Sequence, residues 1–280
     1  MSSDIIIIGA SRGPGRQLFD QLKLTGRPVV GIARKQRGLI VSASAKFVTC
    51  DASNSQALAA LIGQGNTLVN TSRPEFLTNL LKHKPSVARL VALGSTRVFT
   101  RFPDQKCENL NAMKQAISTQ NIPTTILHPT MIYGSEGLNN IERIVKVARL
   151  SPLIPLPASG NALIQPVHVN DVVACILACL EKTDTIGQTL IVAGRSPITY
   201  RELVETCIEF TGSRCRVVSL PYFMLSIIGM LTNIIPGIPS ISQNEIRRLL
   251  EDKAFDVVKL EQQLGIRPLS VREGLRQLLT

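Results

Sequence analysis

The stretch Asp4–Leu18, DIIIIGASRGPGRQL, decides the fold of this chain. Its four consecutive isoleucines, Ile5–Ile8, form the β-branched run that is typical of a strand buried on both faces of a parallel sheet. Gly9, Gly13 and Gly15 follow and lead into an amphipathic helical segment. Glycines let a ligand approach the backbone, and a helix N-terminus offers free N–H groups, so this turn can bind a pyrophosphate. The alternative is an ordinary strand-to-helix turn, but its place at the start of an alternating β/α chain favours the nucleotide site.

The composition is that of a globular α/β protein with a sizeable core. The chain has 280 residues, of which 44% are hydrophobic, so it fits one large domain or a nucleotide-binding domain with a smaller C-terminal lobe. Its net charge of +11 suits an anionic ligand, a nucleic acid or an acidic membrane surface. Only 4% of the residues are aromatic and tryptophan is absent, which disfavours stacking on single-stranded nucleic acid. We therefore expect no nucleic-acid partner.

The cysteines and the N-terminus indicate an intracellular protein. Six cysteines form no C-x-x-C pair and no metal-ligand cluster, so we interpret them as small buried hydrophobic residues in a reducing compartment and expect no metal. The first residues, MSSDIIII, lack the basic region of a signal peptide. The sequence therefore predicts a cytoplasmic location.

Further strands and helices alternate along the chain after the first helix. Strands are predicted over 28–33, 46–50, 67–70, 87–93, 124–127 and 189–193. Helices are predicted between them, with Ser53 or Asn54 as the cap of one. This order predicts a doubly wound parallel sheet of the Rossmann type.

The end of the second predicted strand favours NADP over NAD. An acidic residue there would bind the adenosine ribose hydroxyls, but Arg34 and Lys35 stand at this place, and Arg12 follows Ser11 within the glycine turn. Cations suit a 2′-phosphate better than a free hydroxyl. The alternative is a solvated basic loop.

Four motifs resemble those of the short-chain dehydrogenase/reductase superfamily. The string GASRGPG (residues 9–15) resembles its cofactor turn, and GSTRVF (94–99) resembles the Ser-Ser/Thr-x-Val-Tyr segment of its extended branch. PVHVNDV (166–172) resembles the segment that returns the chain from the substrate lobe to the sheet, and LEQQLGIRPLSVREGL (260–275) resembles the family's C-terminal phrase. The chain is thus similar to atypical extended members of the epimerase/dehydratase type. The resemblance implies NAD(P) as cofactor.

The resemblance also implies roles for single residues. Gly9, Ser11, Arg12, Gly13, Gly15, Arg34, Lys35, Asp51, Asn70 and Lys114 would bind the cofactor, with Asp51 at the adenine and Asn70 in a turn beside it. Ser95 would polarise the substrate, and Lys114 would be the lysine of the family's Tyr-x-x-x-Lys pair. In that pair the ammonium lowers the pKa of the phenol so that it can exchange a proton.

The main departure from the family pattern is Leu110, which takes the place of the catalytic tyrosine. Leucine cannot transfer a proton. Tyr133 is a candidate replacement acid, although the family position shapes the substrate pocket. His128 replaces an arginine and is either a proton donor or, more often for such a residue, a hydrogen-bonded structural side chain.

The resemblance divides the chain into a core and a smaller lobe. Residues 1–134 would form the NAD(P)-binding core, and residues 135–280 a mixed region. In that region, 135–165 and 195–280 would contribute a small, mostly helical substrate lobe, and 166–194 would return to the sheet. We interpret Asn170 or Asp171 as the cap of the returning helix rather than Asp171 as the partner of a catalytic His168.

One stretch without charged residues, 217–244, raises the question of whether the chain contacts a membrane. Prolines interrupt it and leave 14 residues, Tyr222–Ile235, whereas a spanning helix needs about 20 apolar residues. Spanning is therefore disfavoured. Peripheral membrane contact through 220–239, an apolar substrate groove and plain core packing stay open.

Three functions are compatible with these features. The first is an NAD(P)-dependent oxidoreductase or sugar-nucleotide epimerase/dehydratase-like enzyme that prefers NADP and acts on a small carbonyl or sugar-nucleotide substrate. The second is a catalytically disabled NADP-binding protein that acts through a partner, which Leu110 favours. The third is a membrane-surface enzyme acting on a lipid-linked sugar. The oligomeric state stays open, with a homodimer among the options.

Overall fold

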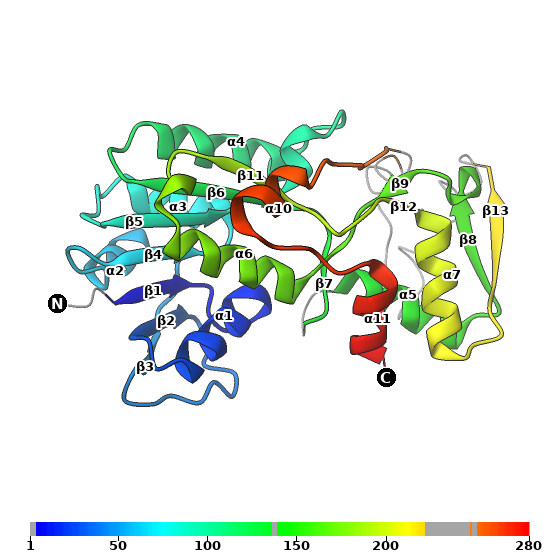
Figure 1. Cartoon of the computed structure of the whole chain (residues 1–280), viewed down its shortest axis with the longest axis horizontal. Helices are drawn as coiled ribbons and strands as arrows, with labels where there is room; N and C mark the ends of the chain where they lie inside the picture. The colour runs from blue at the N-terminus through cyan, green and yellow to red at the C-terminus, as the bar shows by residue number, and fades with distance from the viewer. Residues whose placement is uncertain (1–3, 136–138, 222–246, 248–250, 280) are drawn as a thin grey trace.

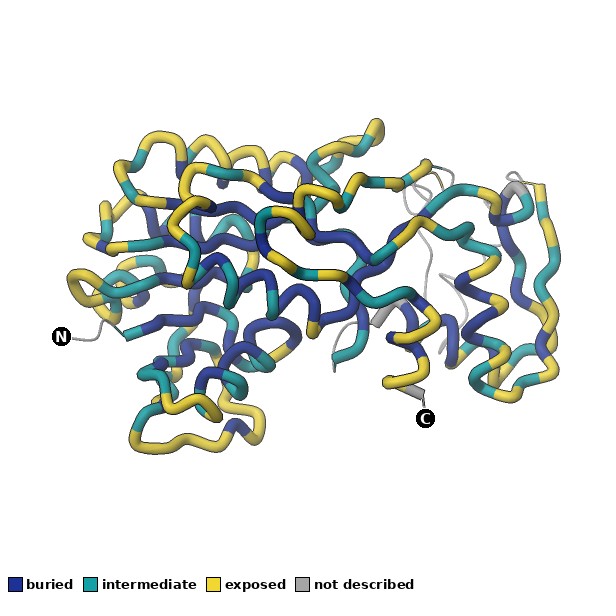
Figure 2. The backbone as a smooth tube through the Cα atoms, in the orientation of Figure 1, coloured by how far each residue is buried: buried dark blue, intermediate teal, exposed yellow. Residues whose placement is uncertain are grey.

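The structure is a computed structural model that describes residues 4–135, 139–221, 247 and 251–279. Figure 1 shows a larger body built around one sheet, which contains the N-terminal half, and a second lobe around α5, α7 and α11. The buried strands of the sheet form the interior of the larger body (Figure 2).

The central sheet has seven parallel strands, as the alternation of strands and helices predicts. Their spatial order is β11 (Thr189–Val192), β6 (Thr124–Pro129), β5 (Arg89–Leu93), β4 (Thr67–Asn70), β1 (Ile5–Ile8), β2 (Val29–Ala33) and β3 (Ala45–Thr49). The order reverses between β1 and β4, so the fold has the switch point at which doubly wound sheets bind ligands. The predicted Rossmann-like α/β fold is confirmed.

The isoleucine run shows why this sheet forms. Ile5 and Ile7 point into one apolar cluster, and Ile6 and Ile8 into another on the opposite face, all at most 4% exposed. Successive side chains of a strand alternate between faces, so a run without polar residues suits only a sheet covered on both sides. Helices provide that cover.

Each face of the sheet has its own set of helices. One face is covered by α1 (Gly13–Leu24), α6 (Val169–Glu181) and α10 (Val258–Leu264). The other is covered by α2 (Ser55–Ala60), α3 (Pro74–Leu81) and α4 (Gln105–Ser118). The Asn54 side chain caps α2 by accepting the N–H of Ala57, which confirms one of the two predicted caps.

The second lobe has a separate apolar cluster. It is built by α5 (Asn139–Leu150), α7 (Tyr200–Thr211), α11 (Val271–Leu279) and β8 (Leu153–Pro157), which pairs with β13 (Arg216–Leu220). Two short strand pairs also occur: β9 (Leu163–Ile164) with β12 (Ile198–Thr199) in this lobe, and β7 (Ile132–Tyr133) with β10 (Val167–His168), which contacts both this cluster and the one beside the central sheet. Three 3₁₀ turns also occur, η1 (Thr96–Phe99), η2 (Ala158–Gly160) and η3 (Thr183–Thr185).

The cap of α6 differs from the prediction. The N-cap is His168, whose Nδ1 accepts the backbone N–H of Asn170 at 3.3 Å, so neither Asn170 nor Asp171 is the cap. Asp171 instead accepts the backbone N–H of Leu269 at 3.0 Å and so fastens the C-terminal segment to α6. His168, two positions before Asn170, takes the capping role because an unprotonated ring nitrogen of histidine can also accept a hydrogen bond from a backbone N–H.

Within the described ranges, no helix has both the length and the apolar character needed to cross a membrane. The segment 220–239, for which membrane contact, an apolar substrate groove and core packing were the three alternatives, lies outside the described residues except for Leu220 and Pro221.

Candidate functional site

The turn between β1 and α1 is the first part of the candidate site. Gly9 has a φ of +93°, a conformation that side chains disfavour. A Cβ atom on Gly15 would lie 2.4 Å from the carbonyl oxygen of Gly9 and 2.3 Å from Thr71 Oγ1, so no larger residue fits there. The Thr71 hydroxyl donates to the carbonyl oxygen of Ile8 at 2.9 Å. A ligand that approaches this turn therefore meets closely packed backbone.

The N-terminus of α1 opens beside these glycines. The helix begins at Gly13, its N-cap residue Arg12 gives no side-chain cap, and its first turn contains no acidic residue. Ser11 is half-buried and Arg12 is exposed, immediately before the helix. Uncapped N–H groups and the positive end of the helix dipole suit an anion. The turn therefore fits the pyrophosphate of a dinucleotide.

Basic residues follow strand β2, and an acidic residue follows strand β3, so both charges lie at the same edge of the sheet. Arg34 and Lys35 are exposed, and in the described part of the chain neither forms an ion pair. Asp51 accepts the backbone N–H of Ser53 at 3.0 Å and its hydroxyl at 2.9 Å. These hydrogen bonds, with a smaller effect of the Arg34 charge, hold the pKa of Asp51 below its usual value. Asp51 therefore stays a carboxylate at neutral pH.

Asn70 lies at the end of β4, next to the glycine turn. Its side chain is fully buried, and its Oδ1 accepts the Ser72 hydroxyl at 2.6 Å. The Asn70 amide nitrogen is buried without a partner among the described residues. The side chain thus shapes the turn formed by residues 70–72, and the turn lies at the predicted place.

Ser95 and His128 meet at the ends of β5 and β6. The backbone N–H of Ser95 donates to His128 Nδ1 at 3.1 Å, and Ser95 Oγ accepts the N–H of Arg97 at 3.2 Å. His128 is fully buried, and its Nε2 has no partner within the described ranges. Burial, and to a smaller degree the charge of Lys114, lowers the pKa of His128 to about 4. The imidazole is therefore neutral at physiological pH, and it positions the Ser95 backbone.

Lys114 and Leu110 share α4 but have different surroundings. Lys114 is exposed on α4, and its positive charge contributes to the lowered pKa of His128. Leu110 is 3% exposed and belongs to the apolar cluster beneath the sheet. A tyrosine at position 110 would have its hydroxyl among these apolar side chains, so exchanging this one residue would not rebuild the family's catalytic pair.

Tyr133 lies in the core of the second lobe rather than in an open cleft. Its ring is fully buried and packs edge-on against His168, with 5.2 Å between the ring centroids. A Cβ atom on Gly274 would lie 2.0 Å from the Tyr133 hydroxyl, so α11 covers it. Burial raises the pKa of Tyr133 well above its usual value. This placement does not fit the predicted role of replacement acid.

The cysteine side chains are free thiols that are mostly buried. All six cysteines are free; Cys50 is half-buried, and the others are buried. Burial raises the pKa of Cys179 to about 11 and that of Cys207 to about 12. Over the described ranges, no group of three or more His, Cys, Asp or Glu residues could hold a metal ion.

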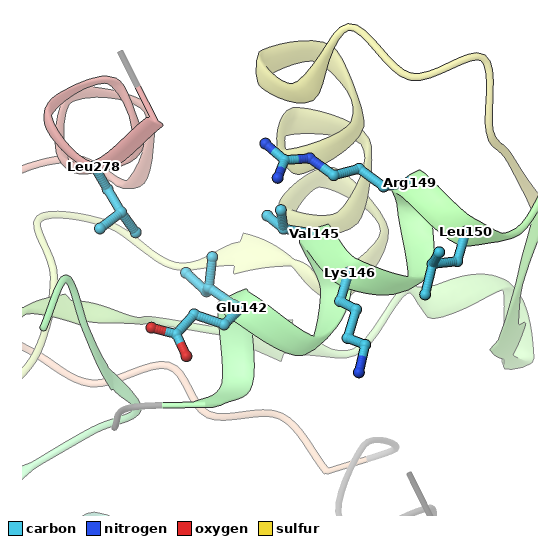
Figure 3. A pocket seen from close by; sticks show the side chains of 7 residues that line it. Glu142, Val145, Lys146, Arg149, Leu150 and Leu278 are labelled. Carbon is cyan, nitrogen blue, oxygen red and sulfur yellow. The ribbon is translucent and has the colours of Figure 1, made fainter. Parts of the chain in front are cut away.

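A hollow of about 520 Å³ lies apart from these strand ends, on α5 and α11. Figure 3 shows Leu278 of α11 facing Val145 and Arg149 of α5. The lining residues are Ile141, Glu142, Val145, Lys146, Arg149, Leu150 and Leu278. None of them belongs to the glycine turn or to a strand of the central sheet. The hollow is therefore not part of the candidate nucleotide site.

Sequence reasoning did not single out Gly94 or Phe99. A Cβ atom on Gly94 would lie 2.4 Å from His128 Nδ1, so this glycine makes room for the imidazole. The Phe99 ring packs edge-on against His128 at 5.8 Å. Both contacts depend on the pairing of β5 with β6, which no local pattern shows.

The curated relatives are distant. An uncharacterized protein of Escherichia coli (strain K12), YbjS, is 26% identical over 64% of this chain and 55% of its own length. Subunit 9 of the NADH dehydrogenase [ubiquinone] 1 alpha subcomplex of Arabidopsis thaliana is 24% identical over 77% of this chain and 60% of its own length. The match thus spans only 55–60% of these two relatives. No protein-family model matches the chain.

Two further comparisons agree with this fold. The photosystem II assembly factor Ycf39 of Trieres chinensis is 24% identical over 81% of this chain and 75% of its own length. The solved structure of MoeE5 in complex with UDP-glucuronic acid and NAD is 18% identical, covers 99% of this chain and 98% of its own, and has a TM-score of 0.75. The chain therefore has the Rossmann-like α/β fold of epimerase/dehydratase-type neighbours, and it resembles the atypical extended short-chain dehydrogenases/reductases.

Proposed function

We propose that this chain is an NAD(P)-dependent oxidoreductase of the epimerase/dehydratase-like type that prefers NADP and acts on a carbonyl group. The observation that supports it best is the contact of Ser95 with His128 at the carboxyl ends of β5 and β6, where the charge of Lys114 also acts on the histidine. This is the edge at which such sheets bind ligands. The fold alone is not sufficient support for this function, because proteins with the same fold catalyse many different reactions.

The side chains have separate tasks in this proposal. When bound, a nicotinamide dinucleotide exchanges hydride with a substrate carbon. Ser95 Oγ accepts the N–H of Arg97, so its hydroxyl hydrogen can donate a hydrogen bond to the substrate oxygen and polarise the carbonyl. Lys114, a cation whose charge also acts on His128, would stabilise the negative charge that develops on that oxygen as the hydride arrives, and the proton that completes the alcohol would come from solvent. Neutral His128 holds the backbone of Ser95 in place.

The NADP preference is supported by the charged edge. Arg34 and Lys35 follow β2 where an acidic residue would bind a free ribose, and Arg12 lies at the start of α1. An arginine–phosphate contact is charge-assisted and stronger than a neutral hydrogen bond.

We expect Arg34→Ala to weaken NADPH binding about tenfold and to change NADH binding less than twofold, since only NADPH carries the 2′-phosphate. Isothermal titration calorimetry with both nucleotides measures this difference. Lys259→Ala, which removes one exposed positive charge from α10, is the control and should bind both as the wild type does. Equal losses for NADPH and NADH in Arg34→Ala would contradict the assignment.

A second candidate function is nucleotide binding without turnover, with action through a partner protein. The observation that favours it is the position of the tyrosines. Tyr133 and Tyr200 pack in the second-lobe cluster, and Tyr222 lies outside the described residues. Two relatives are, by name, a subunit of NADH dehydrogenase and an assembly factor.

Ser95→Ala separates the two functions. For an enzyme, we expect kcat to fall at least about a hundredfold while NADPH affinity changes less than threefold, because Ser95 would act on the substrate oxygen. NADPH oxidation with a panel of carbonyl compounds and UDP-sugars measures it. Ser118→Ala, at the far end of α4, is the matched control. A wild-type protein that binds NADPH but oxidises it with no member of the panel would favour the partner-binding function.

A further inference from the structure

A strap of the chain, residues 251–255, crosses the loop that carries Ser95. The Glu251 carboxylate accepts the Thr100 hydroxyl at 2.8 Å and the backbone N–H of Arg101 at 2.6 Å. Thr100 and Arg101 directly follow η1, the turn that begins after Ser95. One side chain of the strap thus fixes both residues of the loop.

The other end of the strap is fastened to the second lobe. Asp252 accepts the backbone N–H of Leu163 at 2.8 Å, and the Lys253 N–H donates to the carbonyl oxygen of Leu163 at 2.7 Å. The Phe255 N–H donates to Gln165 Oε1 at 2.7 Å. Gln165 is itself 2% exposed and donates to the carbonyl oxygen of Gly194. The position of Phe255 is therefore fixed by a buried side chain.

These anchors place three rings in a row beside Ser95. The Phe255 and Phe99 rings are 6.2 Å apart at an angle of 49°, and the Phe99 and His128 rings are 5.8 Å apart at 76°. The same His128 ring accepts the N–H of Ser95. Phe99 nevertheless remains 52% exposed. The exposed ring of Phe99 therefore contacts the same imidazole that binds the Ser95 backbone.

Two charged side chains at this loop have partners among the described residues. Arg97 donates from Nε to Asp104 Oδ1 at 3.0 Å and forms an ion pair with the same carboxylate. The Glu251 carboxylate is occupied by Thr100 and Arg101. Phe99 is the one exposed residue of the segment 94–100, so a substrate with its reacting oxygen at Ser95 would extend over this ring.

We infer that Phe99 and Phe255 form an aromatic wall of the substrate site and that the substrate is a planar aromatic carbonyl compound, an aldehyde or ketone, rather than a nucleoside-diphosphate sugar. This inference rests on the proposed function, and it specifies the class of carbonyl compound. Aromatic rings bind one another edge-to-face or offset at centroid distances of 4.5–7 Å. A flat conjugated substrate would therefore bind to the wall while its oxygen meets Ser95.

The probe for this inference is 6-propionyl-2-(dimethylamino)naphthalene, an aromatic ketone whose fluorescence shifts to shorter wavelength in apolar surroundings. The chain contains no tryptophan, so the protein contributes little background. Titrations are made with NADP⁺ present, which cannot reduce the ketone. NADPH affinity is measured separately by calorimetry, and unfolding midpoints verify that each variant is folded.

We expect saturable binding that Phe99→Leu and Phe255→Leu each weaken about fivefold, the effect of losing one aromatic contact. Phe102→Leu is the matched control, because Phe102 lies on the same loop and is 40% exposed but makes no ring contact among the described residues. It should change the affinity less than twofold. UDP-glucose should not displace the probe. Should Phe99→Leu fail to fold, Phe255→Leu carries the test.

The outcomes separate the inference from the proposed function. NADPH binding together with probe binding that is equal in all three variants, or that UDP-glucose displaces, overturns the aromatic wall and leaves the oxidoreductase proposal standing. Probe binding that depends on Phe99 and Phe255 without any NADPH binding overturns the proposed function and supports the wall as a ligand site.

Discussion

Gly15→Ala is expected to reduce the affinity for NADPH and NADH at least about tenfold and to lower the free energy of unfolding by about 1–3 kcal/mol, the usual cost of overpacking. The physical reason is that the new methyl group would lie 2.4 Å from the Gly9 carbonyl oxygen and 2.3 Å from Thr71 Oγ1. Thr71 cannot rotate away without breaking its hydrogen bond to Ile8. The turn must therefore open, and α1 moves away from the place where a pyrophosphate would bind.

Calorimetry with both nucleotides and denaturant unfolding measure the two effects of Gly15→Ala. The control is Gly63→Ala, because a Cβ atom at position 63 meets only the flexible side chain of Asn66 and the backbone there is unstrained. Gly63→Ala should leave nucleotide affinity within twofold of the wild type. Unchanged affinity in Gly15→Ala would show that the glycine turn is only architectural.

His128 is expected to make the stability of the protein depend steeply on pH. The pKa of a histidine in an unfolded chain is about 6.5, and burial lowers that of His128 to about 4. Above pH 6.5 the imidazole is neutral in both states, so its contribution is fully present. As the pH falls toward 4, the unfolded chain binds a proton that the folded protein does not, and about 3 kcal/mol of stability is lost. Below that range both states are protonated and the loss is constant.

Urea unfolding of the wild type and of His128→Gln between pH 4 and 7 tests this prediction. Burial also lowers the pKa of His168, and several carboxylates titrate in the same range, so the difference between the two curves is the quantity to compare. The wild type should lose about 3 kcal/mol more than the variant over this interval. The exposed His83, replaced in His83→Gln, is the control and should parallel the wild type. Parallel curves for wild type and His128→Gln would contradict the buried neutral state.

The sequence predicts the framework of this protein well, because the relevant signals are local. A strand without polar residues, Ile5–Ile8, requires cover on both faces, and the glycine turn follows it directly. The positions of Ser95 and Asn70 follow from their places at strand ends, which share one edge of a parallel sheet. These inferences need only the period of a strand and the direction of the chain.

The rest of the site depends on contacts between distant segments. Tyr133 is covered by Gly274, and His128 fits only because residue 94 is a glycine. Glu251 reaches the loop after Ser95 from near the end of the chain. A tyrosine or a histidine looks the same in the sequence whether a partner covers it or a cleft exposes it. The burial that decides its pKa is a property of the packing alone.

The order of the strands has a consequence for how the chain folds. The edge strand of the central sheet, β11, follows the whole α5–β10 region in the sequence but pairs with β6, which precedes that region. During synthesis, the backbone groups along one side of β6 stay unpaired until the ribosome has released Thr189–Val192. Such long-range pairing slows folding, and an unpaired strand edge can join a neighbouring molecule. Premature chain termination before Thr189 therefore leaves the edge of β6 unpaired and prone to aggregation.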